Sequence, residues 1–135
     1  MATAEYDSRA KMNQAEDAVK QTADRLRQIL VEMAAQLEPF PYFLGSIEVR
    51  AIEAEPGGAN KADRGCIVVC QDGELYEFSM KIEAPDDFDF GMERDDSVKP
   101  VHLPPEDYVA YAYNAIKEMG GLIEEQRARG KKYSF

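Results

Sequence analysis

Few residues in this sequence could carry chemistry, and they are scattered. His102 is the only histidine, and an imidazole ring can act as a general base or a metal ligand near neutral pH. No Gly-x-Ser-x-Gly motif accompanies it, and a lone histidine before a helix is usually an ordinary loop residue. We therefore predict no catalytic, cofactor-binding or metal-binding residues, and no cofactor.

The two cysteines indicate the redox state of the protein's compartment, and they predict neither a disulfide nor a metal site. Cys66 and Cys70 bound the run Cys-Ile-Val-Val-Cys, whose β-branched content is typical of a buried strand. Four residues along a strand separate two Cα atoms by about 13 Å, and a disulfide needs less than about 7 Å. A zinc pair would need tighter spacing and further ligands. Two free, buried thiols favour a reducing compartment, so we expect a cytoplasmic protein.

The acidic stretch over residues 86–96 is the most unusual part of the chain. Calcium is one hypothesis, but with Gly91 as the sixth position of an EF-hand loop, Phe88 and Phe90 would occupy two ligand positions. A second hypothesis is a recognition loop, in which the negative field attracts a basic partner and the apolar side chains supply binding energy. Its candidate residues are Asp86, Asp87, Phe88, Asp89, Phe90 and Met92. The alternative is a solvated loop whose phenylalanines pack at the edge of the core.

Composition excludes several classes of function. The chain has 135 residues, 26 acidic against 16 basic, and a formal net charge of −10. Binding to a nucleic-acid backbone or an anionic membrane needs the opposite charge. No apolar run approaches the ~18 residues of a spanning helix, and no signal peptide is recognisable. We expect a single domain, residues 1–135, that binds neither nucleic acid nor membrane.

The first half of the chain predicts a helix followed by a three-stranded meander. Residues 4–38 lack Gly and Pro and carry one apolar stripe, which predicts a long helix within residues 1–38 that ends before Pro39. The meander covers residues 44–82. Alternation of Ile47, Val49 and Ala51 predicts a strand over 45–54, and further strands follow over 66–71 and up to residue 82. Asp72-Gly73 predicts a two-residue type I′ turn between them.

The second half predicts a loop, a helix and a tail. Residues 83–103 form an acidic loop, residues 104–126 a helix that starts at Pro104-Pro105, and residues 127–135 a mobile basic tail. The fold class is therefore α+β: a three-stranded antiparallel sheet, in the order α-β-β-β-α, packed by a long N-terminal helix and a C-terminal helix. In outline this topology is similar to that of type III secretion chaperones, which are likewise small, acidic and mixed α/β. That family has further strands between its later helices, and this sequence predicts none.

The long helix predicts a homo-oligomer. About 32 helical residues span about 48 Å, whereas a compact domain of this length is about 37 Å across. The helix should therefore extend past its own domain. Its N-terminal half offers a narrow seam near seven-residue spacing, and we expect a homodimer through this seam. The candidate interface residues are Tyr6, Met12, Ala15, Val19 and Ala23.

Together these features favour an acidic cytoplasmic protein-binding module that acts without catalysis: an adaptor, a chaperone-like protein or an assembly factor. Its partner is expected to be another protein, and the acidic loop would favour a basic one. One alternative is a small enzyme or ligand-binding protein with a pocket between sheet and helices, near Tyr108, Tyr111, Tyr113 and His102. A second is a polyanion mimic that binds a basic partner. An affinity pull-down would discriminate best.

Overall fold

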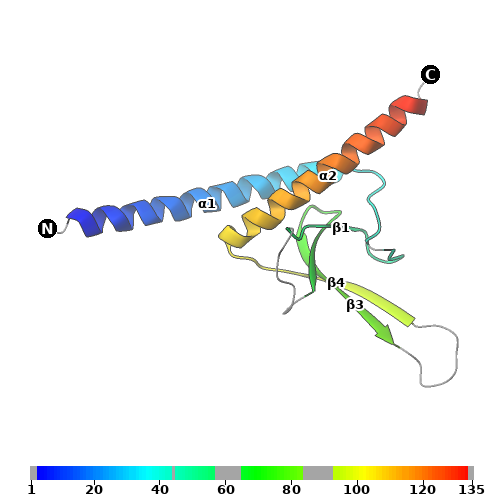
Figure 1. The fold of residues 1–135 in the computed structure, drawn as a ribbon, viewed down its shortest axis with the longest axis horizontal. Helices are drawn as coiled ribbons and strands as arrows, with labels where there is room; N and C mark the ends of the chain where they lie inside the picture. Colours follow the sequence, from blue (N-terminus) through cyan, green and yellow to red (C-terminus); the bar gives the residue numbers. More distant parts are fainter. Residues whose placement is uncertain (1–2, 44, 57–64, 84–92, 134–135) are drawn as a thin grey trace.

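The computed structural model describes residues 3–43, 45–56, 65–83 and 93–133. The chain has an α+β fold with two long helices and one antiparallel sheet, whose strands lie in the order β1-β2-β3-β4 (Figure 1). The prediction of two helices around an antiparallel sheet is confirmed, and the prediction of three strands is wrong by one. The elements in chain order are α1 (Thr3–Gln36), β1 (Ala51–Glu53), β2 (Cys66–Cys70), β3 (Leu75–Glu83), β4 (Glu93–Pro100) and α2 (Pro105–Tyr133).

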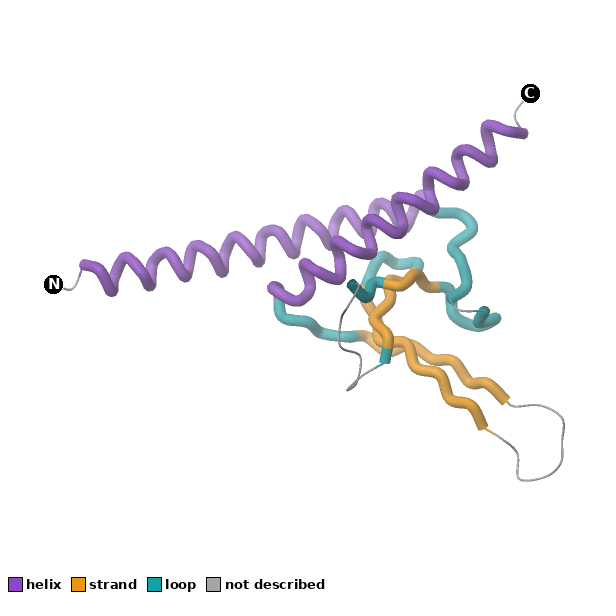
Figure 2. The backbone as a smooth tube through the Cα atoms, in the orientation of Figure 1, coloured by secondary structure: helices purple, strands orange, loops and turns teal. Residues whose placement is uncertain are grey.

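Both helices lie on one side of the sheet and run in the same direction (Figure 2). Their packing is close near Gly120, where an added Cβ atom would lie 3.6 Å from the Met33 side chain. Farther along, the Arg127 guanidinium donates to Gln36 at 3.3 Å. The main core fills the space between the helices and this sheet face, with Leu30, Leu37, Ile67, Val69, Ala112, Ala115 and Met119 among its buried members.

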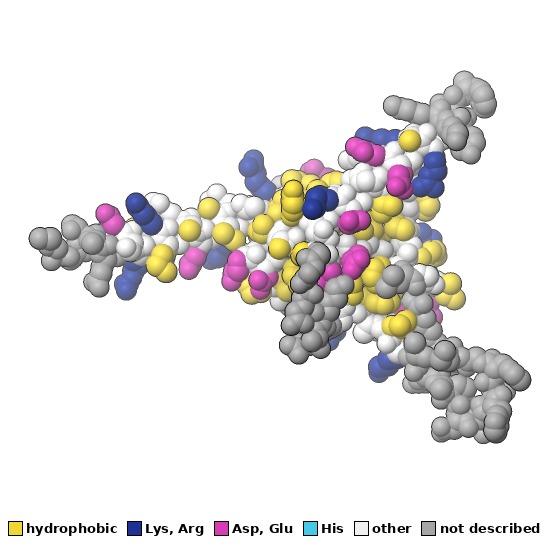
Figure 3. All heavy atoms as spheres, viewed as in Figure 1, with side chains coloured by type: hydrophobic (Ala, Val, Ile, Leu, Met, Phe, Trp, Pro, Cys, Tyr) yellow, Lys and Arg dark blue, Asp and Glu magenta, His cyan; other side chains and the backbone are white. Residues whose placement is uncertain are grey.

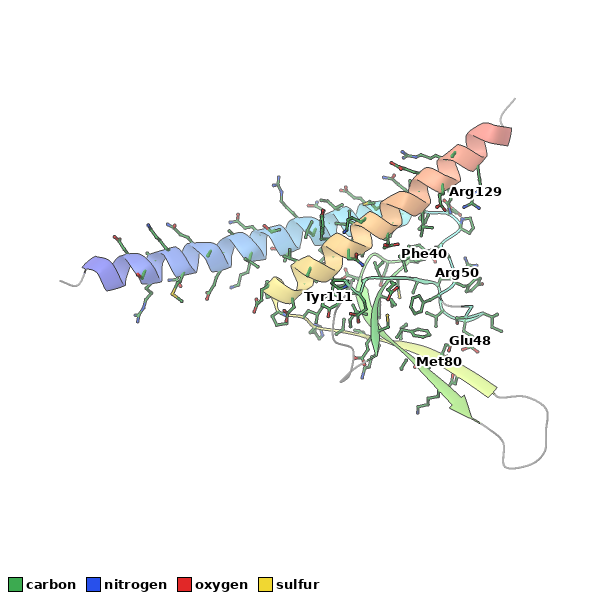
Figure 4. The ribbon with its side chains drawn as sticks, in the orientation of Figure 1. Phe40, Glu48, Arg50, Met80, Tyr111 and Arg129 are labelled. Carbon is green, nitrogen blue, oxygen red and sulfur yellow. The ribbon has the colours of Figure 1, made fainter. Side chains whose placement is uncertain are left out.

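A smaller core covers the opposite sheet face. Val68 and Phe78 project from neighbouring strands on that face, and the connector after α1 supplies Phe43 and Val49 above them. The Phe43 and Phe78 rings meet edge to face with centroids 4.8 Å apart. The connector is fastened by Arg50, which donates to the Phe40 carbonyl at 2.7 Å and to the Tyr42 hydroxyl at 3.0 Å (Figure 4). Both faces of the sheet are thus covered in its central part.

The first strand is shorter than predicted. Only Ala51–Glu53 forms regular ladder pairs, and an isolated bridge joins Tyr42 and Arg50 ahead of it. The Ser46 hydroxyl accepts from the amides of Glu48 and Val49 at 3.1 and 3.0 Å, so these donors are satisfied by a local turn. Ile47 is 85% exposed and does not continue the buried face that its spacing predicted.

The hairpin between β2 and β3 lies where it was predicted, but its loop is one residue longer. The Gly73 amide donates to the Cys70 carbonyl at 2.9 Å, which makes Gly73 the last residue of the turn rather than one of two central residues. The loop is Gln71-Asp72-Gly73, with Gly73 at φ = 82°. A three-residue loop that ends in a left-handed glycine matches the twist of the flanking strands.

The predicted loop over residues 83–103 contains a strand. β4 pairs with β3 over eight positions, from Glu83↔Glu93 to Tyr76↔Pro100. β4 is an edge strand, and charged residues and a terminal proline are what an edge tolerates. Opposite charges face each other at Lys81↔Asp95 and Glu77↔Lys99, and the Ser79 and Ser97 hydroxyls lie 3.2 Å apart. Cross-strand polar pairs therefore take the place of the apolar alternation that is typical of a half-buried strand.

The C-terminal helix continues through the predicted basic tail. α2 ends at Tyr133 instead of residue 126, so residues 127–133 are helical. The Gln126 side chain explains part of this extension, because its amide accepts from the Glu38 amide at 3.1 Å and donates to the Pro39 carbonyl at 3.0 Å. An ion pair one turn apart, Glu125–Arg129 at 3.9 Å, adds modest support.

Candidate functional site

Two features outside the packed core are candidates for function: the N-terminal part of α1 and a pocket beside its middle. The N-terminal part projects away from the sheet, and only its inner end, residues 15–22, lies beside the start of α2 (Figure 1). No side chain among residues 7–22 is buried, and Ala23 is the first buried residue among the helix side chains that the structure describes. We call residues 7–22 the projecting segment.

The predicted oligomer seam lies mostly on this projecting segment. Met12 is 65% exposed, Ala15 is exposed and Val19 is half-buried. Ala23 is covered by the protein's own fold, which removes it from an interface with a second chain. Tyr6 belongs to α1, but its side chain lies outside the described residues. Of the predicted seam residues, Met12 and Ala15 are therefore accessible to a second chain, and Val19 is partly accessible.

The start of α2 marks where the seam closes. Hollows of about 320 and 250 Å³ lie between α1 and the start of α2, and both Val19 and Glu106 line each of them. Acidic and basic side chains alternate along the projecting segment, with apolar ones between them (Figure 3). The segment therefore presents an amphipathic surface without a single dominant charge.

The pocket lies between the middle of α1, the β2–β3 hairpin and the start of α2. Its volume is about 510 Å³, within the usual range for small-molecule sites. We call it the hairpin pocket. Its walls combine apolar and polar groups: Ala23, Asp24 and Arg27 from α1, Glu74, Leu75 and Tyr76 from the hairpin, and Pro100, Val101, His102, Leu103, Pro105 and Tyr108 from the segment that leads into α2.

An ion pair spans this pocket. The Arg27 Nε atom donates to both carboxylate oxygens of Glu74, at 2.9 and 3.2 Å, and its Nη2 atom lies 2.8 Å from Oε1. This hydrogen bonding raises the pKa of Arg27 above its ordinary value. Beside it, the Tyr76 hydroxyl donates to Asp72 at 2.6 Å, which raises the pKa of Tyr76 to about 12. The hairpin thus fixes two polar groups at the pocket wall.

Tyr108 contributes a third polar group. Its hydroxyl oxygen is buried and has no hydrogen-bond partner among the described residues. Burial, followed by the negative charge of Glu74, raises the pKa of Tyr108 to about 12, so the phenol keeps its proton at physiological pH. A buried hydroxyl without a partner is destabilising, and such groups are uncommon in folded proteins.

The predicted pocket residues are only partly brought together. Tyr108 and His102 line the hairpin pocket, as the ligand-binding alternative expected. Tyr111 is buried in the main core between α2 and the sheet (Figure 4), and Tyr113 is 57% exposed beside Lys117. Sequence reasoning missed Arg27, Glu74 and Asp24, because their proximity depends on hairpin and helix packing that no local motif announces.

The remaining sequence candidates give no site in the described residues. Asp86, Asp87, Phe88, Asp89, Phe90 and Met92 lie outside these residues, so the recognition-loop hypothesis stays a prediction. Cys66 and Cys70 are half-buried rather than fully buried as predicted, and no disulfide joins them. Burial together with the Asp72 charge raises the pKa of the Cys70 thiol to about 12. No three His, Cys, Asp or Glu side chains of the described residues gather as metal ligands would.

Across the described residues, neither helix combines the length and the apolar character that crossing a bilayer requires. No protein-family model, curated protein or solved structure matches this chain.

Proposed function

We propose that this protein is a non-catalytic, acidic protein-binding module of the cytoplasm, and that it assembles with a second copy of itself through the projecting segment of α1. Its role would be that of an adaptor, a chaperone-like protein or an assembly factor. The observation that carries the proposal is the absence of any buried side chain among residues 7–22 of a continuous helix.

The physical argument concerns how such a helix is stabilised. An isolated helix of this length is marginal in water, because most helical stability in proteins comes from burying an apolar face. The projecting segment has such a face, with Met12, Ala15 and Val19 at alternating spacings of three and four residues. Burying Met12 and Val19 would contribute about 1.5–3 kcal/mol each. A partner on this face would therefore stabilise the segment as well as bind it.

A second copy fits because the flanking charges of the seam complement themselves. In a parallel pair that layers Met12 on Met12, Lys11 of each copy faces Glu16 of the other. In an antiparallel pair that layers Met12 on Ala15, Arg9 faces Glu16 instead. Either arrangement is two-fold symmetric and places opposite charges across the seam, as is usual for homodimers.

The test is the oligomeric state of the wild type and of two matched variants. Met12→Glu places a charge on the seam, whereas Gln14→Glu places the same charge on the opposite face of the helix. We expect the wild type to dimerise in sedimentation equilibrium, and Met12→Glu to raise the dimer Kd about tenfold or more, which corresponds to 1.4 kcal/mol. Gln14→Glu should leave the Kd nearly unchanged. A wild type that stays monomeric at high micromolar concentration, or equal effects of the two variants, would contradict the proposal.

The hairpin pocket favours a second candidate function, the binding of a small ligand or of one side chain of a partner. Its volume is adequate, and the Tyr108 hydroxyl supplies a polar group without a partner among the described residues. A screen of thermal shifts separates the two candidates, because a ligand present at 100 times its Kd stabilises the protein by about 2.7 kcal/mol. A ligand-dependent shift that Met12→Glu leaves unchanged would assign binding to the pocket.

A further inference from the structure

The hairpin pocket has a charge balance that selects among ligands. Two carboxylates, Asp24 and Glu74, line it against one guanidinium, Arg27. A third carboxylate, Asp72, accepts a hydrogen bond from the hydroxyl of Tyr76 in the pocket wall. Arg27 is already held by Glu74 through two hydrogen bonds, so its charge is largely balanced within the protein. The excess charge in and beside the pocket is negative.

The pKa of Tyr108 is consistent with an excess of negative charge in the pocket. The negative charge of Glu74 raises the pKa of the Tyr108 phenol more than the positive charge of Arg27 lowers it, and Asp24 raises it further. At the Tyr108 hydroxyl, the two carboxylates therefore outweigh the guanidinium. An anionic ligand would have to enter against that negative charge and compete with Glu74 for Arg27.

The remaining walls suit an alkyl chain and a cation. Leu75, Val101 and Leu103 supply apolar surface, and the rings of Tyr76 and Tyr108 supply aromatic surface. Aromatic faces attract ammonium and guanidinium groups through their quadrupole. The buried Tyr108 hydroxyl has no hydrogen-bond partner among the described residues, and a phenol oxygen accepts hydrogen bonds from N–H donors.

We propose that the hairpin pocket binds a basic group, an ammonium or a guanidinium, carried on a short alkyl chain. Asp24 provides the counter-charge, the two tyrosine rings contact the cation, and the apolar walls hold the alkyl chain. The basic group is supplied either by a lysine or arginine side chain of a partner protein or by a free amine. The inference deepens the ligand-binding candidate and does not depend on self-association through the projecting segment.

The experiment is a titration of the ¹⁵N-labelled full chain, followed by its amide chemical shifts. The probes are butylguanidinium and butyrate, two short aliphatic chains that carry opposite charges, and the capped tripeptide Gly-Arg-Gly. We expect saturable shifts at residues 23–27 and 100–108 with butylguanidinium and none with butyrate. Asp24→Asn should raise the Kd about threefold to fivefold, as loss of a partly exposed charge pair does. Tyr108→Phe should raise it as well.

Asp17→Asn is the matched control, because it removes the same charge from the projecting segment, away from the pocket. It should leave the Kd unchanged. An equal effect of Asp17→Asn and Asp24→Asn would mean attraction to an acidic protein in general and would overturn the proposal, as would butyrate shifts at the same amides or no shifts with either cation.

Tighter binding of the tripeptide than of butylguanidinium would assign the source to a partner protein, and weaker binding would assign it to a free amine. These chemical shifts do not depend on dimerisation. A negative result would therefore contradict the pocket proposal and leave the proposed self-association untouched.

Discussion

The two halves of α1 share a composition and differ in their surroundings. Past residue 22, most of the apolar stripe is covered by α2 and the sheet, and Leu30 and Ala34 are almost fully buried, although Ile29 stays 40% exposed. Before it, the same periodicity continues with Met12, which is 65% exposed. An apolar stripe therefore predicts that a helix face is to be buried, without specifying whether the same chain or another one covers it.

The largest contrast is expected between two apolar truncations. Leu30→Ala removes a side chain that is 0% exposed, and it should lower the free energy of unfolding by about 2–5 kcal/mol, since it leaves a cavity in the main core. Met12→Ala should change it by less than about 0.5 kcal/mol at concentrations where the protein is monomeric. Urea unfolding of both variants measures the difference. Equal losses would mean that the projecting segment packs on its own chain after all.

The second contrast compares two glycines with positive φ. Gly73 (φ = 82°) lies against α1, and an added Cβ would come within 2.5 Å of the Val31 Cα atom, whereas Gly45 (φ = 73°) has open space around that position. Gly73→Ala should therefore cost about 2–4 kcal/mol, from backbone strain plus overpacking. Gly45→Ala should cost only the strain, about 1 kcal/mol. Gly73→Val should be worse than either. Similar melting temperatures for the two alanine variants would show that the hairpin does not press on α1.

The third contrast uses two tyrosine hydroxyls of the hairpin pocket. The Tyr76 hydroxyl has a partner in Asp72 at 2.6 Å, and the buried Tyr108 hydroxyl has none among the described residues. Tyr76→Phe should destabilise the protein by about 0.5–1.5 kcal/mol, and Tyr108→Phe should be neutral or stabilising. Thermal unfolding in the absence of ligand distinguishes them. A clear loss of stability in Tyr108→Phe would mean that its hydroxyl is satisfied within the protein.

The last expected effect appears only outside the physiological range, as a decline in stability at alkaline pH. Folding raises the pKa of Cys70 from 9.0 to about 12, and those of Tyr76 and Tyr108 from 10.0 to about 12. The unfolded chain therefore loses these protons first, so the stabilisation is complete below pH 9 and is lost progressively as pH rises toward 12. Urea unfolding across this range should show the decline, and Cys70→Ala should delay its onset to the tyrosine range. A constant free energy of unfolding would contradict the raised pKa values.

The sequence predicted those elements that a local pattern specifies. The absence of Gly and Pro before Pro39 predicted α1 to within two residues of its observed end at Gln36. Asp72-Gly73 predicted the hairpin, although Gln71 also belongs to its loop. β4 was missed because its stability comes from cross-strand partners such as Lys81 and Asp95, which are remote in sequence. Local periodicity contains no information about such pairs.

The candidate sites divide in the same way. Met12 and Ala15 could be predicted as an exposed seam, because the length of the helix required it to extend past the domain. The sequence could not predict that Ala23 is buried and so does not belong to the seam, since its burial depends on how α2 packs on α1. The Arg27–Glu74 pair joins residues 47 positions apart, and only the hairpin brings them together. Tertiary packing therefore determines the pocket and most of its electrostatics.

Hydrogen exchange of the α1 amides at two protein concentrations tests the central claim most directly. If a second copy holds the projecting segment, exchange at residues 7–18 should slow as the concentration rises from about 1 µM to about 100 µM, a range that brackets micromolar dimer Kd values. Exchange at residues 26–36, which the protein's own core protects, should not change. Equal exchange rates at residues 7–18 at both concentrations would contradict the account, because the segment would then be no better held with a second copy than without one.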